Sequence, residues 1–542
     1  MDRGILTIRN LRVESIGHDV LVDDVSLELR RGEVLGLIGE SGAGKSTIGL
    51  ASMYYARAGC HIAGGAVEID GKDLRLLDAR DRRDVRGSRI AYVAQSAAAS
   101  FNPAHTILDQ VIEMPVEHGM MSKQDAIAWA HELFAALDLP DPKTFGRRYP
   151  HQASGGQLQR AMVAMAMSCR PAILVFDEPT TALDVTTQIE VLALIKKLIR
   201  EYKTAALYIS HDLAVVAQVA DRVMVLRGGK MIELGETEQI LSDPKTAYAK
   251  ALVSERKAGG NVSVEAKETR GPLVLDVKNV VGAYKNFIAV RNVSLSVARA
   301  ETVAVVGESG SGKSSLARLI VGLLPRREGS VSFNGAELSP ALKGRARDQL
   351  RRIQLIYQQP DVALNPRQTV GEIISRPLEF YFDRPKSEVN ARVGELLEQV
   401  GLPAQYAKRL STALSGGQKQ RVSIARALAA EPDLIICDEP TSALDQLVAE
   451  EILKLLKRLQ DELGVAYLFI THDLGIVRRL AHRTAVMLRG EVVAEGTTSA
   501  IFQPPFHPYT ERLLASVPET RAGWLEEVLS KRQLDLKEHG AG

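Results

Sequence analysis

The sequence predicts two tandem α/β domains, each with a mostly parallel sheet, an N-terminal antiparallel β part and an inserted helical subdomain. A glycine-rich stretch occurs twice, at Gly39–Ser46 and Gly307–Ser314, each time after an apolar run and before helix-forming residues. Later motifs recur too, and strand-like runs alternate with helical ones. The chain has 542 residues, whereas single hydrophobic cores stop growing at about 250–300 residues, so we expect at least two cores.

Each half opens with β-branched, alternating residues that predict antiparallel strands, at Leu6–Leu29 and Val274–Val297. The glycine-rich loop and its helix follow, and then a charged, helical middle at about 105–150 and about 368–412. Further apolar strands are predicted at Ala172–Phe176, Ala205–Ile209, Leu434–Cys437 and Val465–Ile470.

Equivalent residues recur at nearly constant offsets, which indicates a tandem duplication. Lys45 and Lys313 lie 268 residues apart, while Glu178 and Glu439 lie 261 apart, as a few loop insertions would produce. The stretch between the copies is polar, contains glycine and lacks apolar periodicity, so it predicts a flexible linker. The expected divisions are a first domain at 1–255, a linker at 256–271 and a second domain at 272–542.

The glycine-rich loops are typical of phosphate-binding loops. Glycines let successive backbone N–H groups surround an anion, and the following helix adds the positive end of its dipole. The lysine would reach the β- and γ-phosphates, and the serine after it would bind Mg²⁺. The residues expected to bind the triphosphate are Gly39, Ser41, Gly42, Gly44, Lys45, Ser46 and Thr47, and Gly307, Ser309, Gly310, Gly312, Lys313, Ser314 and Ser315.

Paired acids end two of the predicted strands, Asp177-Glu178 and Asp438-Glu439. Parallel sheets bind ligands at such carboxyl ends. The aspartate would hold Mg²⁺, and the glutamate would act as general base on the attacking water. Strand-end acids can also serve as caps, but the recurrence of the pair at the same interval from its partners favours catalysis.

His211 and His472 follow the next predicted strand, each 33 residues after the glutamate of its half. A lone strand-end histidine is usually structural, but the repeated position favours a hydrogen bond to the γ-phosphate or the attacking water. A Ser-Gly-Gly-Gln turn lies 24 residues before each glutamate and could bind an anion or simply cap a helix. The turns comprise Ser154, Gly155, Gly156 and Gln157, and Ser415, Gly416, Gly417 and Gln418.

Along each half the motifs follow the order phosphate loop, Ser-Gly-Gly-Gln turn, acid pair and histidine. In that order they resemble the nucleotide-binding domains of ABC ATPases, a branch of the P-loop NTPases. The resemblance adds Gln95 and Gln358 as glutamine-loop residues that sense Mg²⁺. It also identifies Thr181–Asp184 and Ser442–Asp445 as dimer-interface loops. The implied Mg²⁺ ligands are Ser46, Gln95 and Asp177, and Ser314, Gln358 and Asp438.

In this family two domains bind ATP head to tail, each nucleotide lying between one phosphate loop and the opposite Ser-Gly-Gly turn. Three departures concern the first half. Ala153 replaces the usual leucine before the turn, and Ala94 stands where the second half has Tyr357. Tyr284 is placed to stack on adenine, whereas the first half has no aromatic residue near Ile16. We therefore expect weaker nucleotide binding at the first loop.

The C-terminal stretch Pro504–Thr510 resembles the tail motif of oligopeptide/dipeptide and nickel importer ATPases, with a weaker echo at Pro244–Tyr248. A solvent-exposed proline turn is the simpler alternative. Some relatives bind an iron–sulfur cluster through C-terminal cysteines, but this tail has none, so we expect no cluster. The resemblance implies two transmembrane permease subunits and, indirectly, an extracytoplasmic solute-binding protein. It places the chain peripherally at the cytoplasmic face of the inner membrane.

Composition limits the alternatives. Net charge is +2, from 68 basic and 66 acidic residues, with no basic stripe, so we expect no nucleic-acid partner. The three cysteines lie far apart and have neither disulfide nor metal spacing. No signal peptide or apolar run of membrane-spanning length is visible.

A soluble double ABC ATPase acting on ribosomes or in DNA repair remains the alternative, although that branch usually has a long charged linker. Exporters are a third class, against which the tail argues.

Overall fold

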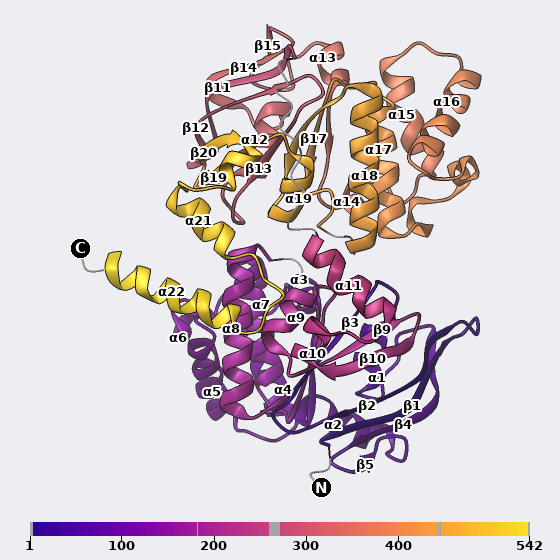
Figure 1. The fold of residues 1–542 in the computed structure, drawn as a ribbon, viewed down its shortest axis with the longest axis vertical. Helices are drawn as coiled ribbons and strands as arrows, with labels where there is room; N and C mark the ends of the chain where they lie inside the picture. The colour runs from indigo at the N-terminus through magenta and orange to yellow at the C-terminus, as the bar shows by residue number, and fades with distance from the viewer. Residues whose placement is uncertain (1–3, 181–182, 259–270, 443, 445, 540–542) are drawn as a thin grey trace. The chain divides into compact units, whose positions relative to one another are not determined.

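The computed structural model describes residues 4–180, 183–258, 271–442, 444 and 446–539. The chain forms two compact units (Figure 1). Unit 1 comprises Met1–Gly259 together with Pro518–Gly542, and unit 2 comprises Gly260–Val517. Each unit contains a four-stranded antiparallel sheet and a six-stranded, mostly parallel sheet, as the sequence predicts.

The six-stranded sheet of unit 1 has the order β10-β9-β3-β8-β7-β6, and only its edge pair β9–β10 is antiparallel. The antiparallel sheet has the order β2-β1-β4-β5. Every residue of β3, β7 and β8 is buried, which explains why these strands are uniformly apolar rather than alternating. The strands are β1 (Leu6–Ser15), β2 (Val20–Leu29), β3 (Val34–Gly39), β4 (Cys60–Ile69), β5 (Lys72–Asp73), β6 (Ile90–Val93), β7 (Ile173–Asp177), β8 (Ala205–Ile209), β9 (Arg222–Arg227) and β10 (Lys230–Glu236).

The helices of unit 1 include the predicted insertion, α4 to α6, between β6 and β7. Side-chain caps begin most of them; Thr106 and Ser122, for example, accept hydrogen bonds from the first turns of α4 and α5. The helices are α1 (Lys45–Ala51), α2 (Ala79–Ser88), α3 (Ala97–Ser100), α4 (Ile107–Glu117), α5 (Lys123–Ala136), α6 (Pro142–Phe145), η1 (Pro150–Gln152), α7 (Gly155–Met167), α8 (Val185–Tyr202), α9 (Leu213–Val219), α10 (Thr237–Ser242), α11 (Ala247–Ala258) and α22 (Trp524–His539).

Unit 2 repeats this arrangement, with sheet orders β12-β11-β14-β15 and β16-β17-β18-β13-β19-β20. Its strands are β11 (Leu273–Tyr284), β12 (Phe287–Ala298), β13 (Thr302–Val306), β14 (Arg326–Phe333), β15 (Ala336–Glu337), β16 (Ile353–Ile356), β17 (Leu434–Asp438), β18 (Ala466–Ile470), β19 (Arg483–Leu488) and β20 (Glu491–Thr497). Its helices are α12 (Lys313–Val321), α13 (Arg347–Arg352), α14 (Pro360–Ala363), α15 (Val370–Tyr381), α16 (Lys386–Gln399), η2 (Ala404–Lys408), η3 (Ser411–Ala413), α17 (Gly416–Leu428), α18 (Gln446–Leu463), α19 (Leu474–Leu480), α20 (Thr498–Ile501) and α21 (Pro508–Ala515).

The C-terminal helix α22 packs in unit 1, beside α8, although the sequence assigned residues 518–542 to the second domain (Figure 1). Trp524 and Leu525 are buried in the core of unit 1. The buried Gln218 of α9 donates from Nε2 to the carbonyl oxygens of Glu519 and Arg521, at 2.7 and 3.0 Å, and accepts from Leu525 N–H at 3.1 Å. One polar side chain thus satisfies three backbone groups of the tail.

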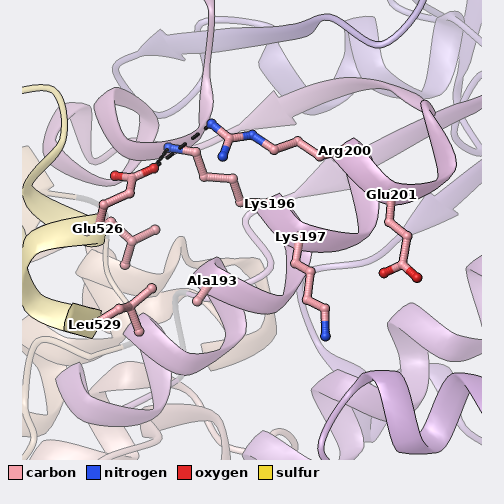
Figure 2. Close-up of a pocket in the computed structure, with 8 residues that line it drawn as sticks. Ala193, Lys196, Lys197, Arg200, Glu201, Glu526 and Leu529 are labelled. Atoms are coloured by element: carbon pink, nitrogen blue, oxygen red, sulfur yellow. Dashed lines mark ion pairs between the residues drawn. The ribbon is translucent and has the colours of Figure 1, made fainter. Parts of the chain in front are cut away.

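Charged residues on α8 also contact α22 (Figure 2). Lys196 forms an ion pair with Glu526 at 2.7 Å and donates to the carbonyl of Gln218 at 2.7 Å. Partial burial raises the pKa of the Glu526 carboxylate, but the hydrogen bond and positive charge of Lys196 help to outweigh it, so the pKa lies below its ordinary value. Burial of apolar side chains and these polar contacts explain why the tail belongs to a unit that lies far from it in sequence.

Helix α11 continues to Ala258, into the range 256–271 that was predicted as a linker. Residues 259–270 lie outside the described part of the chain. None of the helices in the described ranges combines the length and apolar character that a bilayer-spanning helix requires.

Candidate functional site

Both glycine-rich loops lie between a buried central strand and a helix, β3 and α1 in unit 1, β13 and α12 in unit 2. Their first glycines, Gly39 and Gly307, have φ of 152° and 154°, and a Cβ there would lie 2.2 Å from the carbonyl oxygen of Leu226 or Met487. A Cβ at Gly42 would meet nothing within 4 Å. Each loop is therefore packed tightly at its start and open at its tip, which fits a loop that surrounds phosphates.

The two loop lysines are buried and bent back over their own loops. Lys45 Nζ donates to the carbonyl oxygens of Gly39 and Glu40, at 2.7 and 2.8 Å. Lys313 Nζ donates to those of Gly307 and Glu308, both at 2.8 Å. Each ammonium group thus lies at the loop entrance, where it can reach an anion held by the backbone.

A hydroxyl and a carboxylate meet beside each loop. Ser46 Oγ donates to Asp177 Oδ1 at 2.8 Å, and Ser314 Oγ donates to Asp438 Oδ1 at 2.9 Å. Burial raises the pKa of Asp438, although the hydrogen bond from Ser314 opposes it. Oxygen donors of this kind suit Mg²⁺. In the described ranges, no three His, Cys, Asp or Glu side chains are grouped to hold a metal ion.

The two halves place glutamine, glutamate and histidine in the same arrangement. In unit 1, Glu178 accepts from Gln95 Nε2 at 3.1 Å and lies 3.2 Å from His211 Nδ1. In unit 2, Glu439 accepts from Gln358 Nε2 at 2.7 Å and lies 3.2 Å from His472 Nδ1. The three groups predicted from sequence therefore converge at the carboxyl end of the sheet in both halves.

The glutamates also have unusual backbone conformations, with φ of 49° at Glu178 and 48° at Glu439. Left-handed conformations are uncommon for residues other than glycine. Each glutamate N–H donates to the end of the neighbouring strand, to the carbonyl oxygen of Ile209 or Ile470, both at 2.9 Å. This hydrogen bond ties the strained residue to the strand that leads to the histidine.

Both histidines have a raised pKa. Burial lowers the pKa of His211 and His472, but the hydrogen bond and negative charge of Glu178 or Glu439 outweigh it. The stabilisation from the protonated pair is fully present below the unfolded-state pKa of about 6.5 and is lost as the pH rises through the higher folded-state pKa.

We predict that Glu178→Gln lowers the pKa of His211, because the hydrogen bond and negative charge that outweigh burial are lost and only the weaker attraction of Asp212 still opposes it. Histidine resonances followed by NMR during a pH titration of the nucleotide-free protein measure this change. His472 in the same sample is the internal control, since its Glu439 partner is intact. An unchanged His211 titration in the variant would contradict the assigned cause.

The Ser-Gly-Gly-Gln turns begin α7 and α17. Ser154 and Ser415 are the N-caps, accepting from the N–H groups of Gln157 and Gln418 at 3.3 and 3.4 Å, and the glutamine side chains complete capping boxes. Capping and anion binding are compatible, because Ser154 and Ser415 are exposed in their units. Of the dimer-interface loops, residues 181–182, 443 and 445 lie outside the described residues.

The two sites differ in their aromatic residues. Tyr284 is 40% exposed at the end of β11, and Arg318 donates to its hydroxyl at 3.3 Å. The equivalent Ile16 is 74% exposed and has no ring. In unit 1 alone, Tyr92 donates a hydrogen bond to Asp177 Oδ2; the matching position in β16 is Leu355. At the position equivalent to Tyr284 the first half therefore has no aromatic ring, and Asp177 accepts an additional hydrogen bond from Tyr92.

The sequence did not reveal the roles of Tyr92 and Tyr509 near these sites, nor that of Gln218 in holding the C-terminal tail. Tyr509 accepts a hydrogen bond from the N–H of Glu308 in the second loop at 2.9 Å. Tyr92 was detectable only as a polar group in an otherwise apolar strand, and Gln218 as a polar residue in an apolar helix. The contact of Tyr509 spans 201 residues, a separation that no local pattern reveals.

Comparisons with known proteins agree with this geometry. The ABC transporter family matches residues 22–181 and 290–442, and the oligopeptide/dipeptide transporter C-terminal region matches residues 493–542. The glutathione import ATP-binding protein GsiA of Escherichia coli O157:H7 is 39% identical, covering 96% of this chain and 90% of that protein. GsiA of Salmonella choleraesuis is 38% identical, covering 95% and 90%.

Among solved structures, the ATP-binding cassette MJ0796, a dimer bound to ADP and Pi after hydrolysis, is 34% identical, with a TM-score of 0.39; the match covers 41% of this chain and 98% of that one. The family matches cover more than half of the sequence, in both units. The protein is therefore an ATP-hydrolysing subunit that belongs to the ABC transporter family, with two ATP-binding domains and an oligopeptide/dipeptide-type C-terminal region.

Proposed function

We propose that this protein energises the import of small peptides or related solutes, glutathione among the candidates, through a membrane complex. The observation that carries the proposal is the combination of two complete glutamate–histidine sites with a C-terminal region of the oligopeptide/dipeptide type. The relatives named for glutathione import support this solute class. Ribosomal or DNA-repair function lacks any comparable support.

In each half, the loop lysine and backbone N–H groups would bind the triphosphate, and Glu178 or Glu439 would accept a proton from the attacking water. His211 and His472 lie within 3.2 Å of these glutamates and would orient the water or contact the γ-phosphate. Mg²⁺ would neutralise phosphate charge. Its proposed ligands are Ser46, Gln95 and Asp177, and Ser314, Gln358 and Asp438.

In the working cycle, the Ser-Gly-Gly turn of each half would close over the ATP of the other half. Helix N-termini on both sides of the γ-phosphate would make ATP stabilise the closed state, and hydrolysis would release it. The proposed partners are two transmembrane permease subunits and, through them, an extracytoplasmic solute-binding protein. The protein would then lie peripherally at the cytoplasmic face of the membrane.

Reconstitution tests this function directly. We expect the protein to co-purify with two membrane subunits and to support ATP-dependent uptake of glutathione, dipeptides or oligopeptides into vesicles containing them. The Glu178→Gln/Glu439→Gln variant, which keeps its binding loops, is the matched control and should assemble without uptake. Co-sedimentation with ribosomes, together with absence of membrane subunits, would contradict the proposal.

A further inference from the structure

The tail motif His507–Thr510 forms the start of α21 in unit 2. His507 is the N-cap, with Nδ1 accepting from Tyr509 N–H at 3.2 Å, and Pro508 occupies the first turn, where a missing N–H costs little. Tyr509 and Thr510 are only 5% and 4% exposed. The helix start therefore buries Tyr509 and Thr510, whereas the prolines of the motif, Pro504, Pro505 and Pro508, remain exposed.

This helix start contacts the second phosphate loop. Tyr509 Oη accepts a hydrogen bond from Glu308 N–H at 2.9 Å. Arg512, one helical turn later, lies 3.5 Å from Glu308 Oε1 and 5.4 Å from the centre of the Tyr509 ring. Since Glu308 directly follows the first glycine of the loop, α21 contacts both the backbone and the side chain at the loop entrance.

The peptide group that Tyr509 contacts is also the one that Lys313 contacts. The N–H of Glu308 and the carbonyl of Gly307 belong to one planar peptide unit. Its N–H donates to Tyr509, and its carbonyl accepts from Lys313 Nζ at 2.8 Å. A rotation of this peptide that broke the first hydrogen bond would also displace the second, so the tyrosine hydroxyl acts on the position of the ammonium group.

The first half has a corresponding tyrosine. Tyr248, in the echo of the tail motif, has a buried hydroxyl near Glu40, the residue equivalent to Glu308, but within the described residues this hydroxyl makes no hydrogen bond like that of Tyr509. Burial and the neighbouring Glu40 raise the pKa of Tyr248 to about 12, so it is protonated near neutral pH. Lys45 Nζ contacts the Gly39 carbonyl at 2.7 Å, as Lys313 contacts Gly307. The duplicated tyrosine thus accompanies a duplicated lysine contact.

We propose that Tyr509 is a positioning residue of the second ATP site: its hydroxyl orients the Gly307–Glu308 peptide, which in turn places Lys313 against the triphosphate. The inference rests on the proposed role of the loop lysines as phosphate ligands. It makes the C-terminal motif part of the nucleotide site and not only a family marker.

Tyr509→Phe, which removes only the hydroxyl, tests the proposal in the full-length Lys45→Ala background, where the second site is observed alone. We expect ATP and ADP affinity to fall about five-fold, as for one lost hydrogen bond, while AMP affinity is unchanged because AMP lacks the phosphates that the lysine contacts. Calorimetry measures all three. Tyr381→Phe, on α15 away from the loop, is the matched control and should change none.

A double variant separates positioning from general support of the fold. With Lys313→Ala present, Tyr509→Phe should cause no further loss of the residual ADP affinity, because its effect passes through that lysine. Unchanged ATP affinity in Tyr509→Phe, or an equal loss of AMP affinity, would overturn the role assigned to Tyr509 and leave the proposed function of the ATP sites standing. Absence of ATP binding in the Lys45→Ala parent would instead overturn the proposed function of the second loop.

Discussion

The Glu178→Gln/Glu439→Gln variant should lose at least about 100-fold in the rate of ATP hydrolysis while still binding ATP, since a positioned general base contributes roughly 10²–10⁴-fold. Glutamine keeps the size of the side chain but cannot accept a proton from water. In both halves the replaced carboxylate bonds the same two neighbours, a loop glutamine and a histidine. Phosphate release under saturating ATP measures the loss.

Two further measurements make this result specific. Glu395→Gln, an exposed glutamate paired with Arg392 on α16, is the matched control and should leave hydrolysis unchanged. Each single variant should retain an intact site in the other half, which single-turnover phosphate release can detect. Unaltered turnover in the double variant would remove both glutamates from the catalytic role.

The two ATP sites should differ in affinity by about 5- to 150-fold, with the second site tighter, because stacking of a base on an aromatic ring contributes about 1–3 kcal/mol. Lys45→Ala leaves the second site to be measured, and Lys313→Ala leaves the first. Tyr284 offers an exposed ring only in the second half, while Ile16 occupies its place in the first. Calorimetric titration of the two variants with ATP gives both constants.

Removing the ring from the second site and adding one to the first provides the control for that comparison. Tyr284→Ala in the Lys45→Ala background should weaken ATP binding, and Ile16→Tyr in the Lys313→Ala background should strengthen it. Both positions are exposed, so neither change disturbs a core. Equal affinities of the two single lysine variants would show that adenine stacking does not distinguish the sites.

Local patterns predicted much of this molecule. Uniformly apolar strands identified β3, β7 and β8 as central, and the carboxyl ends of such strands are where acidic and histidine side chains must lie. The convergence of Glu178 and His211 follows from that geometry, whereas Gln95 was expected only from the family resemblance. Because the same spacing occurs in the second half, duplication served as an internal check on each residue.

Contacts between distant segments could not be predicted in this way. The hydrogen bond from Tyr92 to Asp177 joins neighbouring parallel strands, and its existence depends on register rather than on any motif. The placement of α22 in unit 1 depends on burial of Trp524 and on Gln218, about 300 residues away in sequence. The tail motif was visible, but not the loop that Tyr509 contacts.

Because α22 belongs to unit 1, a cut between the two halves of the sequence would separate this helix from the rest of its unit. A gene divided within 259–270 would encode an N-terminal fragment lacking the helix that covers α8 and α9, and a C-terminal fragment carrying that helix without its binding surface. The fragments would then complement one another through Trp524 and its neighbours. The chain therefore passes between the two units twice, once within 259–270 and once at Val517–Pro518. A circular permutant cut between Val517 and Trp524 would need α22 to bind α8 and α9 again.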